Sequence, residues 1–122
     1  MGNKHQGLVR EILLLIGSRP DIRIWAQDTG YARALDNPKR VFQYGIEGGG
    51  DISGILPDGR RLEIEVKVPP DTQRDSQRRF QAMIEKHRGV YILATSPHEV
   101  ERRLGELGYV RPDMEANPDF KA

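Results

Sequence analysis

Apolar residues recur along this chain at two different spacings, and each spacing predicts a different kind of element. From residue 5 to residue 16 they lie three or four positions apart, which is the repeat of one face of a helix. Gly17, followed by Pro20, ends that helix. Residues 61–68 instead alternate between apolar and polar, which is the repeat of a strand with one buried face. The chain therefore combines helices with strands.

The same reasoning predicts the order of the elements. Pro57-Asp58-Gly59 is a turn sequence that joins two strands into an antiparallel hairpin, and the continuous apolar run over 90–94 indicates a central, buried strand. Residues 27–39 have the composition of a loop. The predicted elements are a helix over 5–16, strands over 22–26, 51–56 and 61–68, a helix over 73–86, a strand over 90–94 and a helix from 97, with a short strand also allowed over 41–44.

These elements predict an α/β fold. Their order, roughly α-β-β-β-α-β-α, favours a mixed β-sheet flanked by helices on both sides. Thr72 and Asp75 are candidates for a capping box at the second helix, and Ser96 for the cap of the last, in which Leu107 is expected to face inward. We expect a single domain over residues 1–110 and an extended or partly disordered tail over 111–122.

Composition narrows the class of protein. The chain has 122 residues, 30% of them charged, and a net charge of +1, which fits one polar-surfaced domain. It has no apolar run of about 18 residues, so no membrane span is expected. Cysteine is absent, which excludes disulfides, thiolate zinc sites and cysteine nucleophiles and fits an intracellular, cytoplasmic protein. Fourteen of its nineteen cations are arginine, the residue that best forks onto phosphate oxygens.

The residues that could form a functional site lie on the polar face of the hairpin. Counting back through the turn places Asp51 near Glu65, with Lys67 two residues further along the same face. Two carboxylates beside one ammonium suit a hard cation such as Mg²⁺ or Mn²⁺. The alternative is an ordinary solvent-facing strand with cross-strand ion pairs. Glu63 is ambiguous, and we expect it to pair with Arg61.

The ordered set of motifs resembles a known family. Asp51 followed by Glu65-Val66-Lys67 is similar to the D…(D/E)xK signature of the PD-(D/E)xK nuclease superfamily. The motifs Trp25-Ala-Gln-Asp-Thr-Gly30, Gly50-Asp51-Ile-Ser-Gly-Ile-Leu56, Asp58-Gly59-Arg60 and Gln77-x-x-Phe80 resemble, in order and spacing, the VRR-NUC family, the virus-type replication-repair nuclease domain. The resemblance implies a restriction-endonuclease-like fold and a DNA-repair endonuclease that hydrolyses phosphodiester bonds with Mg²⁺ or Mn²⁺. Branched DNA, such as Holliday junctions or flaps, is the implied substrate and a homodimer the implied assembly.

The resemblance also implies roles for individual residues. Asp51 and Glu65 would be metal ligands, with the Val66 carbonyl as a third, and Lys67 would be the catalytic lysine. The acidic residue that the family carries on its first helix points to Glu11, which we place at the edge of an inward stripe. Gln77 matches a helix glutamine near the metal or the scissile phosphate. The alternatives are a surface Glu11 in a local ion pair and a Gln77 that is an ordinary satisfied amide.

Three cations of the second helix are candidates for DNA contact. Arg74, Arg78 and Arg79 could hold backbone phosphates, or could simply form a solvated helix face. Glycines 48–50 are expected to bend the chain and to let DNA approach. The histidines at 5, 87 and 98 are scattered and form no expected ligand set. The alternative to an endonuclease is a non-catalytic DNA-binding or assembly module with the same fold.

Overall fold

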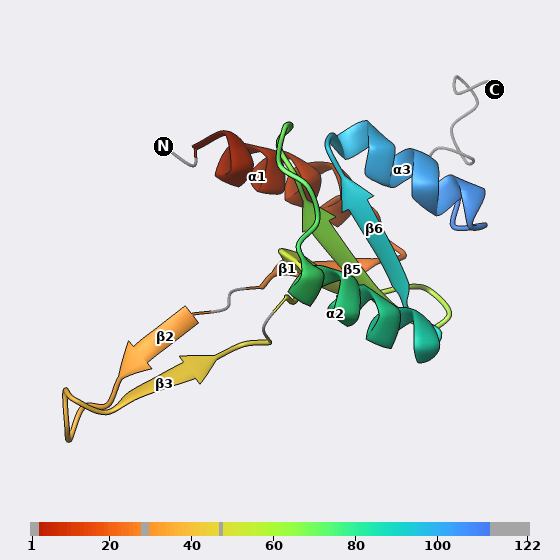
Figure 1. The fold of residues 1–122 in the computed structure, drawn as a ribbon. Coiled ribbons are helices and arrows are strands. Elements are labelled where there is room, and N and C mark those ends of the chain that lie inside the picture. The colour runs from red at the N-terminus through yellow and green to blue at the C-terminus, as the bar shows by residue number, and fades with distance from the viewer. Residues whose placement is uncertain (1–2, 28–29, 47, 113–122) are drawn as a thin grey trace.

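A computed structural model describes residues 3–27, 30–46 and 48–112. The elements follow one another in an α/β order (Figure 1). They are α1 (Asn3–Gly17), β1 (Arg23–Ala26), β2 (Gly30–Arg33), β3 (Val41–Tyr44), β4 (Ile52–Ile55), β5 (Arg61–Val66), α2 (Asp75–Lys86), β6 (Val90–Ala94) and α3 (Pro97–Glu106).

The main sheet has four strands in the order β1-β4-β5-β6. Strand β4 runs antiparallel to both β1 and β5, whereas β6 pairs with β5 in parallel. The predicted mixed sheet flanked by helices is therefore confirmed. The parallel pair has α2 as its crossover, because two parallel neighbours cannot be joined by a tight turn.

Helices cover the two faces of the sheet unequally. α1 and α3 lie on one face, where their buried residues, such as Ile12 and Leu104, form the main core with Ile64 and Ile92 of the sheet. On the other face α2 packs against β6, and Phe80 meets Tyr91 edge-on with their ring centroids 6.4 Å apart. The face of the sheet toward α1 and α3 is thus apolar, whereas the face toward α2 carries both apolar and polar side chains.

The alternation of β5 follows the prediction, but its polar face is not a solvent face. Leu62, Ile64 and Val66 enter the main core, as their spacing indicates. Glu63 and Glu65 point to the opposite side, yet their exposed fractions are only 1% and 3%. Two carboxylates buried under a helix require partners, since an unpaired buried charge is costly.

Several predicted details are wrong. β6 is at the edge of the sheet rather than in its centre, and it is apolar because α3 and α2 cover its two faces. Leu107 is 42% exposed because α3 ends at Glu106, where the chain turns away through Gly108 with a φ of 96°. Part of the predicted 27–39 loop is strand: β2 pairs with β3 from Gly30↔Tyr44 to Arg33↔Val41.

The β2–β3 pair is a separate two-stranded sheet that projects away from the rest of the molecule (Figure 1). Its strands are only four residues long and β2 begins with glycine, so local sequence carries little strand signal. The predicted C-terminal tail lies outside the described residues apart from Arg111 and Pro112. Arg111 itself is held to α1 and α3, because its guanidinium donates to the Leu15 carbonyl at 2.9 Å and to Glu101 at 3.1 Å.

Among the described residues, none of the helices combines the length and the apolar character that crossing a membrane requires.

Candidate functional site

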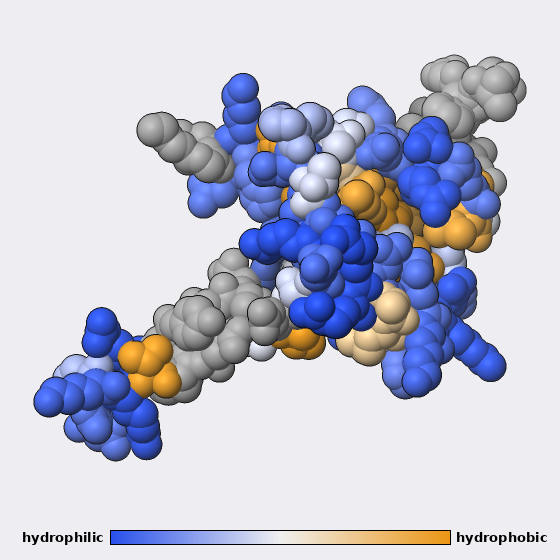
Figure 2. Space-filling model, viewed as in Figure 1, coloured by the Kyte–Doolittle hydropathy of each residue, from blue (hydrophilic) through white to orange (hydrophobic). Residues whose placement is uncertain are grey.

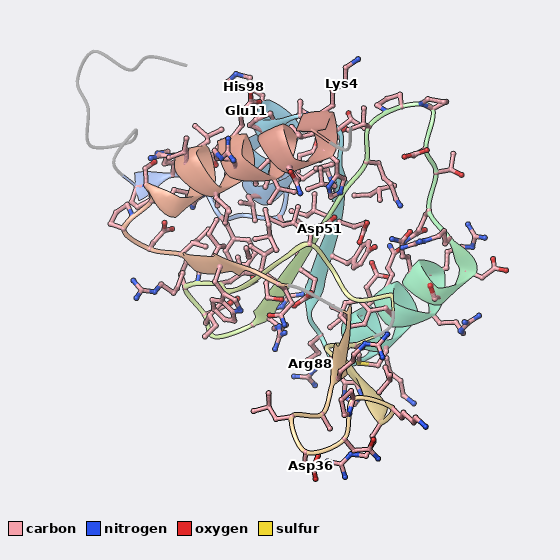
Figure 3. The ribbon with its side chains drawn as sticks, turned by 90° about the vertical axis from the view of Figure 1, so that its left-hand side faces the viewer. Lys4, Glu11, Asp36, Asp51, Arg88 and His98 are labelled. Atoms are coloured by element: carbon pink, nitrogen blue, oxygen red, sulfur yellow. The ribbon has the colours of Figure 1, made fainter. Side chains whose placement is uncertain are left out.

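The register of the hairpin brings Asp51 and Glu65 to neighbouring positions. Ile52 pairs with Ile64, so one further step along both strands places Asp51 opposite Glu65. The Asp51 carboxylate is fixed there because its Oδ2 accepts a hydrogen bond of 2.8 Å from the Val66 backbone N–H. Asp51 lies below α1, near the middle of the molecule (Figure 3).

Glu65 is the most constrained acid of the site. Its Oε2 accepts a hydrogen bond of 2.9 Å from the Gln77 amide, and the Lys67 ammonium lies 3.6 Å from the same oxygen. Its Oε1 is buried and has no hydrogen-bond partner in the described structure, although a protonated Glu65 shares a hydrogen bond with the neighbouring Asp51 carboxylate, which helps to raise the pKa of Glu65. A buried oxygen without a partner is rare in folded proteins and indicates a missing proton, water or ion.

The electrostatics of Glu65 agree with its geometry. Burial, followed by the negative charge of Asp51, raises the pKa of Glu65 to about 8, and the positive charge of Lys67 only partly opposes this. Without an additional cation, Glu65 therefore holds a proton at neutral pH. The pair of acids is a place where one more positive charge is stabilised.

Gln77 links this acid to the start of α2. Its Nε2 donates to Glu65, while its Oε1 accepts a hydrogen bond of 2.8 Å from the Arg74 backbone N–H. Gln77 is 2% exposed, so both ends of its amide are satisfied inside the protein. The helix begins at Asp75 with Arg74 as its N-cap, so the predicted cap at Thr72 is wrong: the Gln77 amide supplies the capping bond instead.

The glycine run packs against this assembly rather than opening it to a ligand. A Cβ on Gly48, whose φ is 76°, would lie 2.3 Å from the Ser76 carbonyl oxygen. A Cβ on Gly50 would lie 2.8 Å from Oε1 of Glu63. The close approach that these glycines permit is therefore that of the chain to its own helix and strand, where any side chain would clash. The expected approach of DNA at this run is not needed to explain it.

Glu63 is the charge partner of Arg61, as predicted. Its Oε2 accepts a hydrogen bond of 2.7 Å from the Arg61 Nε. This ion pair neutralises the buried Glu63 carboxylate. Glu63 therefore has its own charge partner and is not counted with Asp51 and Glu65 as a candidate metal ligand.

The structure does not bring Glu11 to the site. Its side chain is exposed and lies on the outer side of α1, away from Asp51 (Figure 3). The predicted inward stripe is confirmed at Ile12, which is buried, and at Leu8 and Leu15, which are partly buried against the core; it is wrong only at Glu11. Glu11 directly precedes the buried Ile12, and successive residues of a helix point about 100° apart around its axis, so the Glu11 side chain points to solvent.

His5 occupies the position that was expected for Glu11. Its Nε2 lies 3.1 Å from the Val66 carbonyl oxygen and 3.4 Å from Asp51 Oδ2. This contact was not expected, because the histidines at 5, 87 and 98 are scattered along the chain and predict no ligand set. The available signal was its spacing of seven residues, two helical turns, from the buried Ile12.

The three candidate DNA-contacting arginines are exposed, Arg78 and Arg79 on α2 and Arg74 at its N-cap. Hydrophilic residues gather over the beginning of this helix (Figure 2), which is the end that Gln77 joins to Glu65. The guanidinium of Arg78 already has protein partners, because it donates a hydrogen bond of 2.8 Å to the Gln73 carbonyl and pairs with Asp75. The surface at the start of α2 is therefore polar and carries three exposed arginines, of which Arg78 is paired with Asp75.

The residues present fit a divalent cation. Asp51, Glu65 and the Val66 carbonyl offer hard oxygen donors, and the unpartnered Oε1 of Glu65 is an oxygen that a cation would satisfy. Among the described residues, no three His, Cys, Asp or Glu side chains are grouped so that they could hold a metal ion. Two carboxylates are sufficient for Mg²⁺, which keeps several of its waters.

Comparison of the chain with models of protein families, with curated proteins and with solved structures finds no match.

Proposed function

We propose that the protein is an endonuclease that hydrolyses phosphodiester bonds of DNA with Mg²⁺ or Mn²⁺. The observation that carries the proposal is the buried Glu65 carboxylate, which has one unpartnered oxygen and stands beside Asp51 and Lys67. An ordinary surface strand would leave these groups in water. A structural ion pair would satisfy both oxygens of the acid.

Asp51, Glu65 and the Val66 carbonyl are the groups that would hold the cation. When bound, a divalent cation would neutralise the two carboxylates and polarise a phosphate oxygen. Gln77 holds Oε2 of Glu65 in a fixed direction, which leaves Oε1 as the oxygen without a hydrogen-bond partner in the described part of the chain. Lys67, whose side chain is only 12% exposed, would orient a water molecule and stabilise negative charge that develops on the phosphate.

The exposed arginines at the start of α2 support a polyanionic substrate. Arg74 is exposed at the N-cap of α2 and Arg79 further along that helix, at the end from which Gln77 reaches Glu65, so we place a bound strand along this end of the helix, near the acids. Such contacts bind phosphate without reading sequence. We propose branched DNA as the substrate, a homodimer as the active form and the cytoplasm as the location.

Nicking of DNA tests this proposal. Purified protein would be incubated with a four-way junction, a flap and a linear duplex, each with Mg²⁺, Mn²⁺ or EDTA. We expect metal-dependent nicking by the wild type, and none by Lys67→Ala or Asp51→Asn, both of which should still bind DNA. Lys86→Ala, at the exposed end of α2, is the control that removes one lysine without touching the acids.

Two results would contradict the proposal. Full nicking by pure Lys67→Ala would remove the lysine from the chemistry. Binding of branched DNA by the wild type, with no nicking under any metal, would indicate the non-catalytic DNA-binding module instead.

A further inference from the structure

His5 is the residue of α1 that reaches the two acids from the opposite layer of the fold. Its Nε2 lies 3.1 Å from the Val66 carbonyl oxygen, a contact between residues 61 positions apart in the chain, and 3.4 Å from Asp51 Oδ2. Both of these oxygens belong to groups that the proposed function assigns to the cation. A single ring nitrogen therefore lies beside two oxygens that would bind the same ion.

The spacing of these atoms is that of neighbouring ligands around one ion. Ligands at about 2.1 Å from a cation and at right angles to each other are about 3.0 Å apart. The two distances from Nε2, 3.1 Å and 3.4 Å, are close to this value. Only a small movement of the ring would be needed to convert the hydrogen-bonded arrangement into a ligand set.

We infer that His5 Nε2 is a ligand of the proposed metal centre, together with Asp51 and the Val66 carbonyl. The inference rests on the proposed metal site and adds to it a donor from α1. His5, Asp51 and Glu65 are not grouped as three metal ligands among the described residues, so the ring of His5 would have to move toward the acids for Glu65 to complete the set.

The hydrogen bond that is present would change when the ion binds. Both neighbouring oxygens only accept, so the nitrogen that faces them carries the ring proton in the metal-free protein. As a ligand, Nε2 must present its lone pair, and the proton is then carried by Nδ1 of the neutral ring. The side chain of His5 is 40% exposed, so this exchange can take place through solvent.

A nitrogen donor alters which ions the site prefers. Mg²⁺ takes oxygen ligands almost exclusively, whereas transition ions gain affinity from imidazole. His5 should therefore contribute to the binding of Mn²⁺ much more than to the binding of Mg²⁺. A role for His5 in packing alone would not distinguish the two ions.

Binding of Mn²⁺ and Mg²⁺ to the full-length protein, without DNA, tests the inference. Titration calorimetry would compare the wild type with His5→Ala and with His98→Ala, whose histidine is exposed on α3 and lies away from Asp51 (Figure 3). We expect His5→Ala to weaken Mn²⁺ binding by at least ~10-fold and Mg²⁺ binding by less than about threefold. His98→Ala should bind both ions as the wild type does.

Pulsed electron paramagnetic resonance of the Mn²⁺-loaded wild type gives a second readout that requires no variant to fold. Coupling of the Mn²⁺ electron spin to an imidazole nitrogen is expected in the wild type and in His98→Ala, and its loss in His5→Ala. Unchanged Mn²⁺ affinity in His5→Ala, tighter binding by that variant, or no nitrogen coupling in the wild type would overturn the inference. None of these three results would affect the proposed function, whereas a wild type that binds neither ion would overturn both.

Discussion

At the scale of single residues, the site depends on Glu65. The sequence places this acid on the polar face of a strand, where a solvent-exposed ion pair would be the common outcome. The structure instead buries it under α2, and the reason is Gln77, whose amide caps the helix and binds the acid at the same time. Such a double role cannot be predicted from spacing, because it depends on where the helix starts.

Replacement of Glu65 by Gln should stabilise the metal-free protein at high pH. The ordinary pKa of a glutamate is 4.5, and in the folded protein that of Glu65 is raised to about 8, first by burial. Between these values the folded state holds a proton that the unfolded state releases, so the stability of the wild type falls as the pH rises through this window. Gln does not titrate and has the shape of the protonated acid.

Thermal unfolding in EDTA at pH 5 and pH 9 measures this effect. We expect the midpoint of the Glu65→Gln variant to exceed that of the wild type by about 5 °C or more at pH 9, and to approach it at pH 5. Mn²⁺ at pH 9 should raise the midpoint of the wild type alone. An identical dependence on pH in the two proteins would contradict the assigned environment of Glu65.

At the scale of elements, the sequence predicted best where the signal was local. The Pro57-Asp58-Gly59 turn, the limits of β6 and the Ser96 cap of α3 each follow from residues within a few positions of one another, and the structure has all three. The start of α2 and the inward face of α1 depend on contacts with β5, which lies far away in the sequence. The prediction failed at these two places, as it did for β2 and for the position of β6 at the edge of the sheet, which also depend on pairing between distant segments.

The two candidate helix caps give a direct comparison. The Ser96 Oγ accepts a hydrogen bond of 3.1 Å from the Glu99 backbone N–H, so Ser96→Ala should lower the free energy of unfolding by about 1 kcal/mol. Thr72 is exposed and precedes the true start of α2 by three residues, so Thr72→Ala should change it by less than about 0.5 kcal/mol. Urea unfolding of both variants provides the measurement, and an equal loss in the two would show that α2 begins at Thr72.

At the scale of the whole molecule, the site is assembled from three layers. His5 comes from α1, Asp51 and Glu65 from the sheet, and Gln77 from α2. The sequence identified the strand and α2 residues because one hairpin and the helix that follows it carry them. It missed the α1 residue because the docking of α1 on the sheet, through Ile12 and Ile16, decides which side chain reaches the acids.

The placement of charge around the fold leads to a prediction for DNA binding. In a variant with Asp51→Asn, added to prevent cleavage, Arg74→Gln with Arg79→Gln should weaken binding to duplex DNA. It should also reduce the slope of log affinity against log salt by about 2, one unit for each lost phosphate contact. Fluorescence anisotropy at several salt concentrations measures both quantities.

The control removes the same charge from another helix. Arg102→Gln with Arg103→Gln lies on α3, where both arginines pair with Glu106, and should leave the salt slope unchanged. Equal losses in the two double variants would mean that net charge, rather than the surface of α2, determines the affinity.

Anomalous diffraction from crystals soaked in Mn²⁺ tests the central claim most directly. A divalent ion held by Asp51, Glu65 and the Val66 carbonyl would give a peak within about 2.3 Å of oxygen atoms from these groups. Its absence from Asp51→Asn crystals would confirm the assignment. A Mn²⁺-soaked wild type with no peak between Asp51 and Glu65, and with Oε1 of Glu65 bound to some other group, would contradict it.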